Sequence, residues 1–329
     1  IHVIYLSSDT SDPGLCFVHE RFHSFEIGEG TIRTWLFENI DTDVIVMTMP
    51  DLETFHIKRS RYPVHYVYVQ HSLVSLHMVY RSGAFDHYDT IFCSGPHHVQ
   101  ETRALEQFAN LPAKLIVKHG YARVSSIIEE AFATIQPCKK VPNPPHVLIA
   151  PSWGPDGTIE RCGIQLVDVL LQAGFEVTLR PHPNTVKLAG VVLEKIHRKH
   201  GKNSNFHFES NVAGCDALLR SQVMVSDWSG AALEYAFGLG KPVVFIDVPR
   251  KVNNPDYATL ELEPIEVSIR EKIGVVVDPE QLDTLPKVLF GVIETGLDHS
   301  DFFNLRDKLV FNIGKQDEVG ARYLIGLLD

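Results

Sequence analysis

The sequence lacks the cysteine pattern of a disulfide-rich protein. Only five of its 329 residues are cysteines, and no two of them stand in Cys-x-x-Cys spacing. An odd, unpatterned set of cysteines is typical of reduced thiols in a cytoplasmic protein. The chain begins at Ile1 and not at Met, which leaves room for an upstream segment that carries targeting information.

Long apolar runs and an excess of basic residues are missing as well. No apolar run approaches the roughly 20 residues that span a bilayer, and neither a signal peptide nor a basic amphipathic helix is visible. The net charge of −11 argues against a general nucleic-acid binder. With 44% hydrophobic and 22% charged residues, the chain has an ordinary globular composition, and its length suits two domains.

Two short matches to metal-binding motifs carry little weight. Residues 19–23 read His-Glu-Arg-Phe-His, the zinc-protease pattern, but the segment between Gly14 and Gly28 is too short for the long helix of those enzymes. Residues 41–43 read Asp-Thr-Asp, which precedes a strand instead of following one, so we interpret it as a turn. No Walker loop is present, and Gly28 and Gly30 form no dinucleotide-binding fingerprint. The sequence therefore predicts no metal site.

Short apolar runs alternate with helical patterns along most of the chain, which predicts an α/β fold with parallel sheets. The expected strands are residues 2–6, 43–47, 64–70, 90–93, 115–118, 146–150, 176–180, 205–209, 223–226 and 272–277, with one more ending at residue 248. The expected helices are residues 97–108, 125–133, 158–173, 186–200, 216–220, 231–237, 279–293 and 319–328.

A proline-rich segment divides this pattern into two halves. Residues 137–145 hold four prolines in nine positions, which predicts an extended linker. We therefore expect two facing Rossmann-like domains, an acceptor-side domain over residues 1–140 and a donor-side domain over residues 141–310. Residues 311–329 contain the last helix, which we expect to cross back onto the first domain. Ligands of such folds bind at the carboxyl ends of the strands, in the crevice between domains.

The most informative stretch is residues 223–248, which read VMVSDWSGAALEYAFGLGKPVVFIDV. It predicts a buried strand, a turn with Asp227, Ser229 and Gly230, and an apolar helix. A helix that begins directly after a strand presents unpaired N–H groups and a positive dipole end to the crevice, where phosphate commonly binds. Glu234 lies just over one turn into the helix, where its carboxylate can meet sugar hydroxyls beside the phosphate.

Two more strand ends in the second half carry polar residues. Residues 151–154 read Pro-Ser-Trp-Gly and offer N–H groups and a hydroxyl to phosphate, and prolines on both sides hold His182 on a rigid turn. A histidine held in this way suits a hydrogen bond to a diphosphate. Three strand ends that meet at one crevice therefore predict a diphosphate site. The expected donor-side residues are Ser152, Trp153, Gly154, Arg180, His182, Ser226, Asp227, Ser229, Gly230 and Glu234.

The first half offers fewer candidates. His71 follows the strand over residues 64–70, where a neutral imidazole can take a proton from an attacking hydroxyl; a structural histidine that caps the strand is the alternative. His119, Tyr121 and Arg123 follow the strand over residues 115–118 as possible contacts to acceptor or phosphate. Arg123 suits bidentate phosphate binding, and a surface salt bridge is the alternative.

The order of these segments resembles the CDP-glycerol glycerophosphotransferase family, the teichoic-acid-type polymerases and primases and their Gram-negative capsule relatives. The likeness covers residues 66–290 and is strongest over residues 149–248. It implies a GT-B fold and the transfer of a polyol phosphate from a CDP-activated donor to a hydroxyl acceptor in cell-surface polymer synthesis. His71 matches the family's general-base histidine and His182 its diphosphate-contacting histidine, and Ser226, Asp227 and Ser229 match its Ser-Asp-Tyr-Ser-Ser turn.

The sequence departs from the family on the acceptor side. Ser72 and Leu73 replace the Gly-Thr that follows the first histidine, and Val124 and Ser125 replace an Asn-Asp pair after Arg123. The donor half therefore matches the family better than the acceptor half.

The resemblance implies that His71 deprotonates the acceptor hydroxyl, which attacks the β-phosphate and expels CMP. His182, Ser152 and the helix start at Ser229 would stabilise the developing charge. No metal or other cofactor is then required, and Mg²⁺ stays an alternative. We expect a cytoplasmic enzyme, peripheral at the inner membrane face, that acts on a lipid-linked or glycan acceptor.

Two other functions stay open. One is a glycosyltransferase that uses a CMP- or UDP-sugar, with Asp227 or Glu234 on the ribose or sugar. The other is a catalytically silent nucleotide- or glycan-binding protein, which Ser72 and Leu73 favour.

Overall fold

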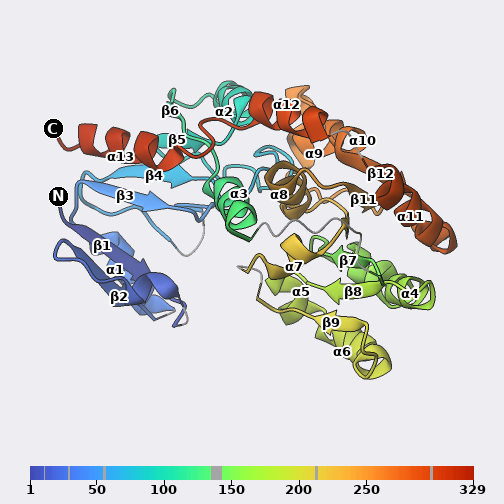
Figure 1. Ribbon diagram of the computed structural model, residues 1–329. Helices are drawn as coiled ribbons and strands as arrows, with labels where there is room; N and C mark the ends of the chain where they lie inside the picture. The colour runs from blue at the N-terminus through green and yellow to red at the C-terminus, as the bar shows by residue number, and fades with distance from the viewer. Residues whose placement is uncertain (11, 29, 55–56, 135–142, 212–213, 297–298) are drawn as a thin grey trace.

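The computed structural model describes residues 1–329 except residues 11, 29, 55–56, 135–142, 212–213 and 297–298. Most of the expected linker lies outside the described residues. The remaining chain forms two halves, each built on its own parallel sheet (Figure 1).

The second half is a six-stranded parallel sheet in the order β12-β11-β10-β7-β8-β9. Numbered within this half, the order is 3-2-1-4-5-6, that of doubly wound dinucleotide-binding folds, whose ligands bind where the strand order reverses. That switch point lies between β7 and β10. The strands are β7 (His146–Ile149), β8 (Glu176–Leu179), β9 (Phe206–Phe208), β10 (Val223–Ser226), β11 (Val243–Ile246) and β12 (Gly274–Val277).

Helices cover this sheet because its strands are apolar on both faces. Every residue of β10 and β11 is buried, as expected of strands packed on both sides. The helical segments are α4 (Thr158–Gln172), α5 (Pro183–Leu188), α6 (Gly190–His200), α7 (Asp216–Arg220), α8 (Gly230–Leu239), η2 (Pro255–Leu260), α9 (Ile265–Ser268), α10 (Arg270–Ile273), η3 (Pro279–Thr284) and α11 (Leu285–Thr295).

Three expected elements of this half differ from the structure. The single helix expected over residues 186–200 is two helices, α5 and α6, which meet at Ala189. Residues 272 and 273 end helix α10 instead of beginning β12, and the helix expected over residues 279–293 begins as the 3-10 segment η3. Local apolar periodicity does not distinguish these breaks from continuous elements.

The first half holds a four-stranded parallel sheet in sequential order, β3 (Val44–Met47), β4 (His65–Val69), β5 (Thr90–Cys93) and β6 (Leu115–Lys118). Helices α2 (Pro96–Phe108) and α3 (Ala122–Thr134) follow β5 and β6. The expected first strand exists as β1 (Val3–Ser7), but it pairs with β2 (Phe22–Glu26) in a separate two-stranded sheet. The sequence did not indicate β2, the 3-10 turn η1 (Pro13–Cys16) or helix α1 (Thr31–Asn39).

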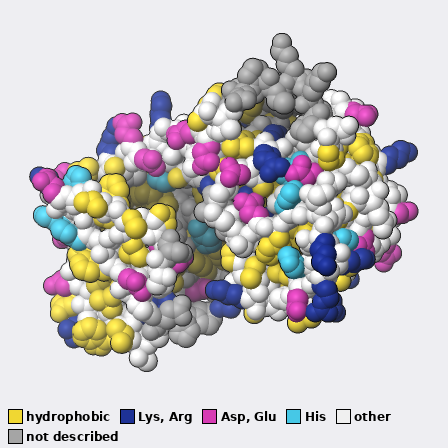
Figure 2. All heavy atoms as spheres, turned by 60° about the horizontal axis from the view of Figure 1, so that its bottom comes forward, with side chains coloured by type: hydrophobic (Ala, Val, Ile, Leu, Met, Phe, Trp, Pro, Cys, Tyr) yellow, Lys and Arg dark blue, Asp and Glu magenta, His cyan; other side chains and the backbone are white. Residues whose placement is uncertain are grey.

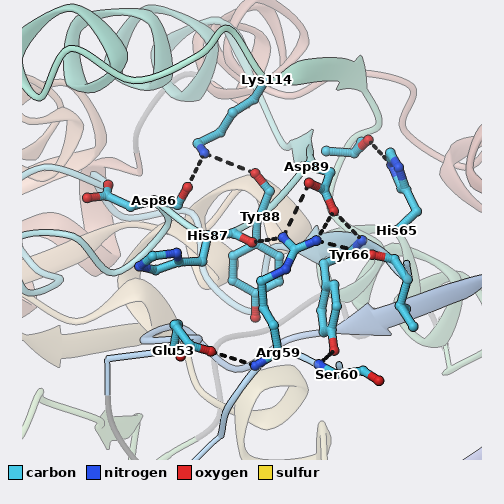
Figure 3. A network of polar contacts seen from close by, with 12 residues as sticks. Glu53, Arg59, Ser60, His65, Tyr66, Asp86, His87, Tyr88, Asp89 and Lys114 are labelled. Carbon is cyan, nitrogen blue, oxygen red and sulfur yellow. Dashed lines mark hydrogen bonds and ion pairs between the residues drawn. The ribbon is translucent and has the colours of Figure 1, made fainter. Parts of the chain in front are cut away.

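Polar contacts hold the edge of the four-stranded sheet where its strands begin (Figure 3). Asp89 Oδ2 accepts hydrogen bonds from Arg59 NH2 at 3.0 Å and from the Tyr66 amide at 2.7 Å. Lys114 Nζ donates to the carbonyl oxygens of Asp86 and Tyr88. These contacts lie at the edge opposite the strand ends, so they support the sheet without entering the crevice.

The last two helices connect the halves. Helix α12 (His299–Leu309) contacts α8, and α13 (Gln316–Gly326) crosses the first-half sheet (Figure 1). The Tyr323 hydroxyl lies 2.8 Å from Thr90 Oγ1, and its ring packs edge-on against Phe92. The chain thus returns to the first half after completing the second.

A shared core also joins the halves. Helices α3 and α8 lie against each other, and a Cβ atom at Gly238 would meet Ile127 Cγ2 at 2.5 Å. Leu73 and Tyr121 of the first half belong to the same buried cluster as Phe237. The absent side chain at Gly238 therefore allows the two helices their close approach.

Candidate functional site

A cleft of about 730 Å³ lies between the halves and takes its walls from both. Figure 2 shows the molecule hollowed between its two lobes. Ten predicted site residues line it: His71, Tyr121, Arg123, Ser152, Trp153, Arg180, His182, Ser229, Gly230 and Glu234. Four others do not: His119, Gly154, Ser226 and Asp227.

Asp227 lies at the switch point, but it holds loops together instead of facing the cleft. Its Oδ1 accepts from the Ser152 amide at 2.7 Å, and its Oδ2 accepts from Thr158 Oγ1 at 2.8 Å and the Thr158 amide at 3.3 Å. Only 1% of Asp227 is exposed. The prediction that Asp227 contacts the ligand is therefore wrong, because its carboxylate oxygens already accept hydrogen bonds from Ser152 and Thr158.

Ser226 and Gly154, which were also predicted to contact the ligand, do not line the cleft. Ser226 is buried and its hydroxyl donates to the Ala150 carbonyl at 2.8 Å, which joins β10 to the end of β7. Gly154 lies in the turn after β7 with φ +139°, and Gly157 donates to its carbonyl oxygen. Both residues shape the strand ends without lining the cleft.

The start of helix α8 faces the cleft, but less of it is free to meet a ligand than the sequence suggests. Ser229 caps the helix by accepting from the Ala231 amide at 3.3 Å. A Cβ atom at Gly230 would meet Ser72 Oγ at 2.3 Å. A side chain at residue 230 would therefore displace the Ser72 hydroxyl, where the first-half loop touches the helix start. The Ala231 and Ala232 amides already donate to Ser229.

His182 has a defined tautomer. It is the N-cap of α5, and its Nδ1 accepts from the Asn184 amide at 3.0 Å, so the ring proton lies on Nε2. Burial, helped by the charges of Lys251 and His71, lowers the pKa of His182 to about 4. Near neutral pH the ring is therefore an uncharged hydrogen-bond donor, which suits the predicted contact to an anionic ligand.

Lys251 is a cleft residue that the sequence reading missed. Its Nζ lies 4.1 Å from the ring centre of Trp153, and the rings of Trp153 and His182 are 6.0 Å apart. Burial lowers the pKa of Lys251 to about 8, against the opposing charges of Asp227 and Glu160. The signal was available, because Lys251 follows strand β11 as the other site residues follow their strands.

Arg180 lines the cleft with much of its charge already neutralised. Its Nε and NH2 both donate to Glu209 Oε2, at 3.1 Å and 2.9 Å. The guanidinium is buried, so this pairing fixes its position. A ligand therefore meets Arg180 as an oriented donor and not as a free cation.

His71 stands on the opposite wall between two tyrosines. Its Nδ1 lies 2.9 Å from the Tyr68 hydroxyl, and its Nε2 lies 3.3 Å from the Tyr80 hydroxyl. The surrounding protein lowers the pKa of His71 by desolvation, opposed by a hydrogen bond to the Thr48 main chain, although the ring is open to the cleft. A proton on Nδ1 donated to Tyr68 leaves Nε2 as a proton acceptor facing the cleft.

Tyr121 and Glu234 join the walls below His71. The Tyr121 hydroxyl lies 2.9 Å from the His71 carbonyl oxygen and 2.7 Å from Glu234 Oε1. One hydroxyl proton serves only one acceptor, and a protonated Glu234 satisfies the other contact. Burial raises the pKa of Glu234, which favours this form, while Arg123 Nε lies 4.0 Å from Oε2. The Tyr121 hydrogen bond and the Arg123 charge oppose the effect of burial on this pKa. Arg123 is thus a cleft residue beside Glu234, and Glu234 already has a protein partner in Tyr121.

His119 lies outside the cleft, contrary to the prediction. Its ring stacks on Phe92 at 4.6 Å, and it faces helix α13 so closely that a Cβ atom at Gly320 would lie 2.9 Å from Nε2. Burial lowers the pKa of His119. The neutral ring therefore belongs to the contact between α13 and the first-half sheet.

The loop that carries His71 is held by residues distant in sequence. Ser75 donates from its amide and hydroxyl to Glu266, at 2.9 Å and 2.7 Å and a separation of 191 residues. The Leu76 amide donates to Glu101 Oε2, and Asn254 donates to the carbonyl oxygen of His77 at 2.9 Å. Glu266 and Asn254 belong to the second half, so both halves fix the loop over residues 71–80.

The two metal-motif matches have no metal-binding geometry. Residues 19–23 lead into strand β2 instead of forming a helix, and residues 41–43 precede β3, away from the strand ends. Within the described part of the chain, no group of three or more histidine, cysteine or acidic side chains could hold a metal ion. Likewise, none of the described helices has the length and apolar character needed to cross a bilayer.

No family model and no curated protein matches the sequence. Solved structures share its fold over nearly the whole chain. A variant of the wall teichoic acid polymerase TagF has a TM-score of 0.60 at 13% identity, covering 99% of this chain and 81% of that one. The same polymerase soaked with CDPG gives 0.59 at 14% identity, with 99% and 81% covered.

A second enzyme has the same architecture. The UDP-GlcNAc 2-epimerase of Methanocaldococcus jannaschii, in complex with UDP-GlcNAc and UDP, has a TM-score of 0.57 at 14% identity, covering 98% of this chain and 91% of that one. These likenesses confirm the GT-B fold and the resemblance in fold to the teichoic acid polymerase. Identities this low show the fold alone.

Proposed function

We propose that the protein is a GT-B-fold transferase that moves a polyol phosphate from a CDP-activated donor to a hydroxyl acceptor. The observation that carries this proposal is the presence of His71 and His182 on opposite walls of one cleft, close enough for the charge of one to affect the pKa of the other. The volume of about 730 Å³ falls in the range of small-molecule sites.

The second-half wall suits the donor. His182 Nε2–H, the start of α8 at Ser229 and the Lys251 ammonium offer hydrogen bonds and positive charge to a diphosphate. Donors fixed in place before the reaction stabilise developing charge, an effect commonly worth several kcal/mol. Trp153 presents an aromatic face beside Lys251, on which a nucleobase could stack.

The first-half wall suits proton removal. A neutral His71 takes the acceptor's hydroxyl proton on Nε2, in place of its long contact with Tyr80. The alkoxide oxygen then forms a bond to the donor's β-phosphorus, and the bond from that phosphorus to the bridging oxygen breaks. CMP departs with the electron pair of that bond. His71 returns the proton to solvent.

The proposal extends to the surroundings of the enzyme. The teichoic acid polymerase shares the fold, so we propose a lipid-linked or glycan acceptor and work at the cytoplasmic face of a membrane. Ser72 and Leu73, which depart from the family pattern, have structural roles: Ser72 touches the start of α8, and Leu73 lies in the shared core. Their replacement is thus compatible with an intact cleft.

A second candidate is a sugar-nucleotide enzyme that binds a uridine donor. The UDP-GlcNAc 2-epimerase, whose structure holds UDP-GlcNAc and UDP, favours it by its shared fold. The two candidates differ in the base of the nucleotide and in whether phosphate travels with the transferred group.

Calorimetric titration separates the candidates. We expect CDP and CMP to bind more tightly than UDP, with and without Mg²⁺, and His182→Ala to weaken CDP binding while circular dichroism shows a folded chain. Preferential UDP binding would favour the second candidate. Binding of neither nucleotide would refute both and leave a silent protein.

A further inference from the structure

Asp51 is a cleft residue to which neither the sequence reading nor the reaction assigns a role. It follows strand β3 and lines the first-half wall, as His71, Tyr80 and Arg81 do. The Thr48 main chain, three residues before Asp51, lies close enough to His71 to raise the pKa of its ring, against the larger effect of burial. The loop that carries Asp51 therefore adjoins the proposed base.

The backbone at Asp51 is held in a strained conformation. Its φ of +67° lies in the left-handed region, which costs a residue other than glycine about 1 kcal/mol or more. Its amide donates to the Ala84 carbonyl at 2.8 Å, and its carbonyl accepts from the Thr54 amide at 3.2 Å. Just before it, Met49 accepts a hydrogen bond from the Tyr88 hydroxyl. The strained turn is thus fixed by contacts on both sides.

The carboxylate has unused hydrogen-bonding capacity. Its Oδ1 is buried and meets no hydrogen-bond partner among the described residues, while its Oδ2 lies 4.0 Å from Arg81 NH1. Burial raises the pKa of Asp51, and the Arg81 charge opposes that change. A buried acceptor without a partner costs free energy unless a ligand supplies the donor.

We propose, on the basis of the function proposed above, that Asp51 binds a second hydroxyl of the acceptor, beside the hydroxyl that His71 deprotonates. The acceptor is then a polyol or sugar with neighbouring hydroxyls. One hydroxyl donates to the Asp51 carboxylate, while the other faces Nε2 of His71. Arg81, at the cleft mouth, lies where it meets an anionic group of the same acceptor.

Asp51→Asn tests the proposal without disturbing the turn. Asparagine tolerates positive φ better than most residues, so the variant keeps the backbone and loses the charged acceptor. Asp51→Gly relieves the strain and also removes the carboxylate. It therefore serves as the test if the Asp51→Asn variant misfolds. Glu53→Gln is the matched control, because Glu53 shares φ +67° two residues away and does not line the cleft. Its Oε2 accepts instead from the Arg59 amide at 2.7 Å (Figure 3).

The measurement is binding of sn-glycerol 3-phosphate, with inorganic phosphate as the comparison ligand, with and without saturating CDP. We expect both Asp51 variants to weaken glycerol 3-phosphate binding about tenfold or more, as loss of a hydrogen bond to a charged group implies. Phosphate binding should not weaken in the Asp51 variants, and Glu53→Gln should bind both ligands at the wild-type level.

Three results would overturn the proposal: undiminished glycerol 3-phosphate binding in the variants, an equal loss of phosphate binding, or no binding to the wild-type chain. The CDP titration is read separately. If CDP fails to bind, the proposed transferase is refuted while the glycerol 3-phosphate result still decides the role of Asp51.

Discussion

The two walls of the cleft are built by different means. On the second-half wall, the site residues follow consecutive strands of one sheet, and a single carboxylate, Asp227, ties two of those strand ends together. On the first-half wall, His71 and Tyr80 belong to a loop that is held by hydrogen bonds to Glu266, Asn254 and helix α2. The first wall's geometry therefore depends on the second half, while the second wall is supported by its own sheet.

The largest expected effect tests the base on the loop-built wall. His71→Asn should lower the rate of CMP release from CDP-glycerol by about 10²–10⁴-fold, because general-base catalysis is lost. CDP affinity should stay unchanged, since the donor residues lie on the other wall. His119→Asn is a control for loss of a buried histidine outside the cleft. Wild-type turnover in His71→Asn would remove it from the mechanism.

On the second-half wall, which its own sheet supports, loss of the Asp227 carboxylate should lower the stability of the fold. Asp227→Asn should lower the free energy of unfolding by about 1–3 kcal/mol, because the amide cannot accept from both Ser152 and Thr158 through two oxygens. Urea denaturation measures the change. Asp156→Asn, in the loop between β7 and α4 that Asp227 holds, changes a residue paired with the exposed Arg161 and should cost less than about 1 kcal/mol. Equal losses in the two variants would contradict the tying role of Asp227.

Acid should loosen the first half before the second. A buried histidine with a lowered pKa is neutral when folded and takes up a proton on unfolding, so its stabilising effect is full above pH 6.5 and is lost as the pH falls towards 4. Among the described residues, four histidines of the first half and two of the second have a lowered pKa, although the ring of His71 is open to the cleft. They are His71, His97, His98 and His119 in the first half and His146 and His182 in the second half.

Buried acidic groups act in the opposite direction. Burial raises the pKa of these groups, so protonation at low pH favours the folded state. Among the described residues, the second half has more of them. They are Asp51 and Glu101 in the first half and Glu160, Glu234 and Glu266 in the second half. Burial lowers the pKa of His77, but the contacts with Glu101 outweigh it and the pKa is raised, so His77 also opposes acid unfolding. Hydrogen exchange from pH 7 to pH 4 should thus lose protection first in β4 and β5; earlier loss in β7 and β10 would reverse the comparison.

The smallest expected effect concerns the cross-half contact. Glu266→Ala removes the acceptor for both Ser75 hydrogen bonds and should lower kcat about tenfold by loosening the His71 loop, with CDP affinity unchanged. Glu266→Gln should recover most of the rate, because its amide can accept from the Ser75 amide and donate to the hydroxyl. An unchanged kcat in Glu266→Ala would show that the loop needs no support from the second half.

The contrast between the walls also explains what the sequence could predict. Strand β10 and helix α8 could be predicted because apolar runs and the Ser-Gly turn are local signals. A parallel sheet also brings the ends of its strands to one edge, so residues that follow the strands are expected to lie together. His182 was found by this reasoning, and Lys251 could have been. The direction of a side chain is not local, so Asp227 was assigned to the ligand although its carboxylate turns towards Ser152 and Thr158.

The first wall was harder to predict for the same reason. Nothing near Asp51 indicates its positive φ, which contacts with Ala84 and Thr54 impose. The bond from Ser75 to Glu266 joins residues that no local pattern relates. His119 follows a strand as His71 does, and only the return of helix α13 covers it.

The close approach of α3 and α8 at Gly238 has a consequence for how the molecule melts. Because Ile127 fills the space at that glycine and the surrounding core draws residues from both halves, neither half retains a complete core after the other unfolds. We therefore expect a single cooperative heat-absorption peak, with equal calorimetric and van't Hoff enthalpies, in a chain long enough for two independent transitions.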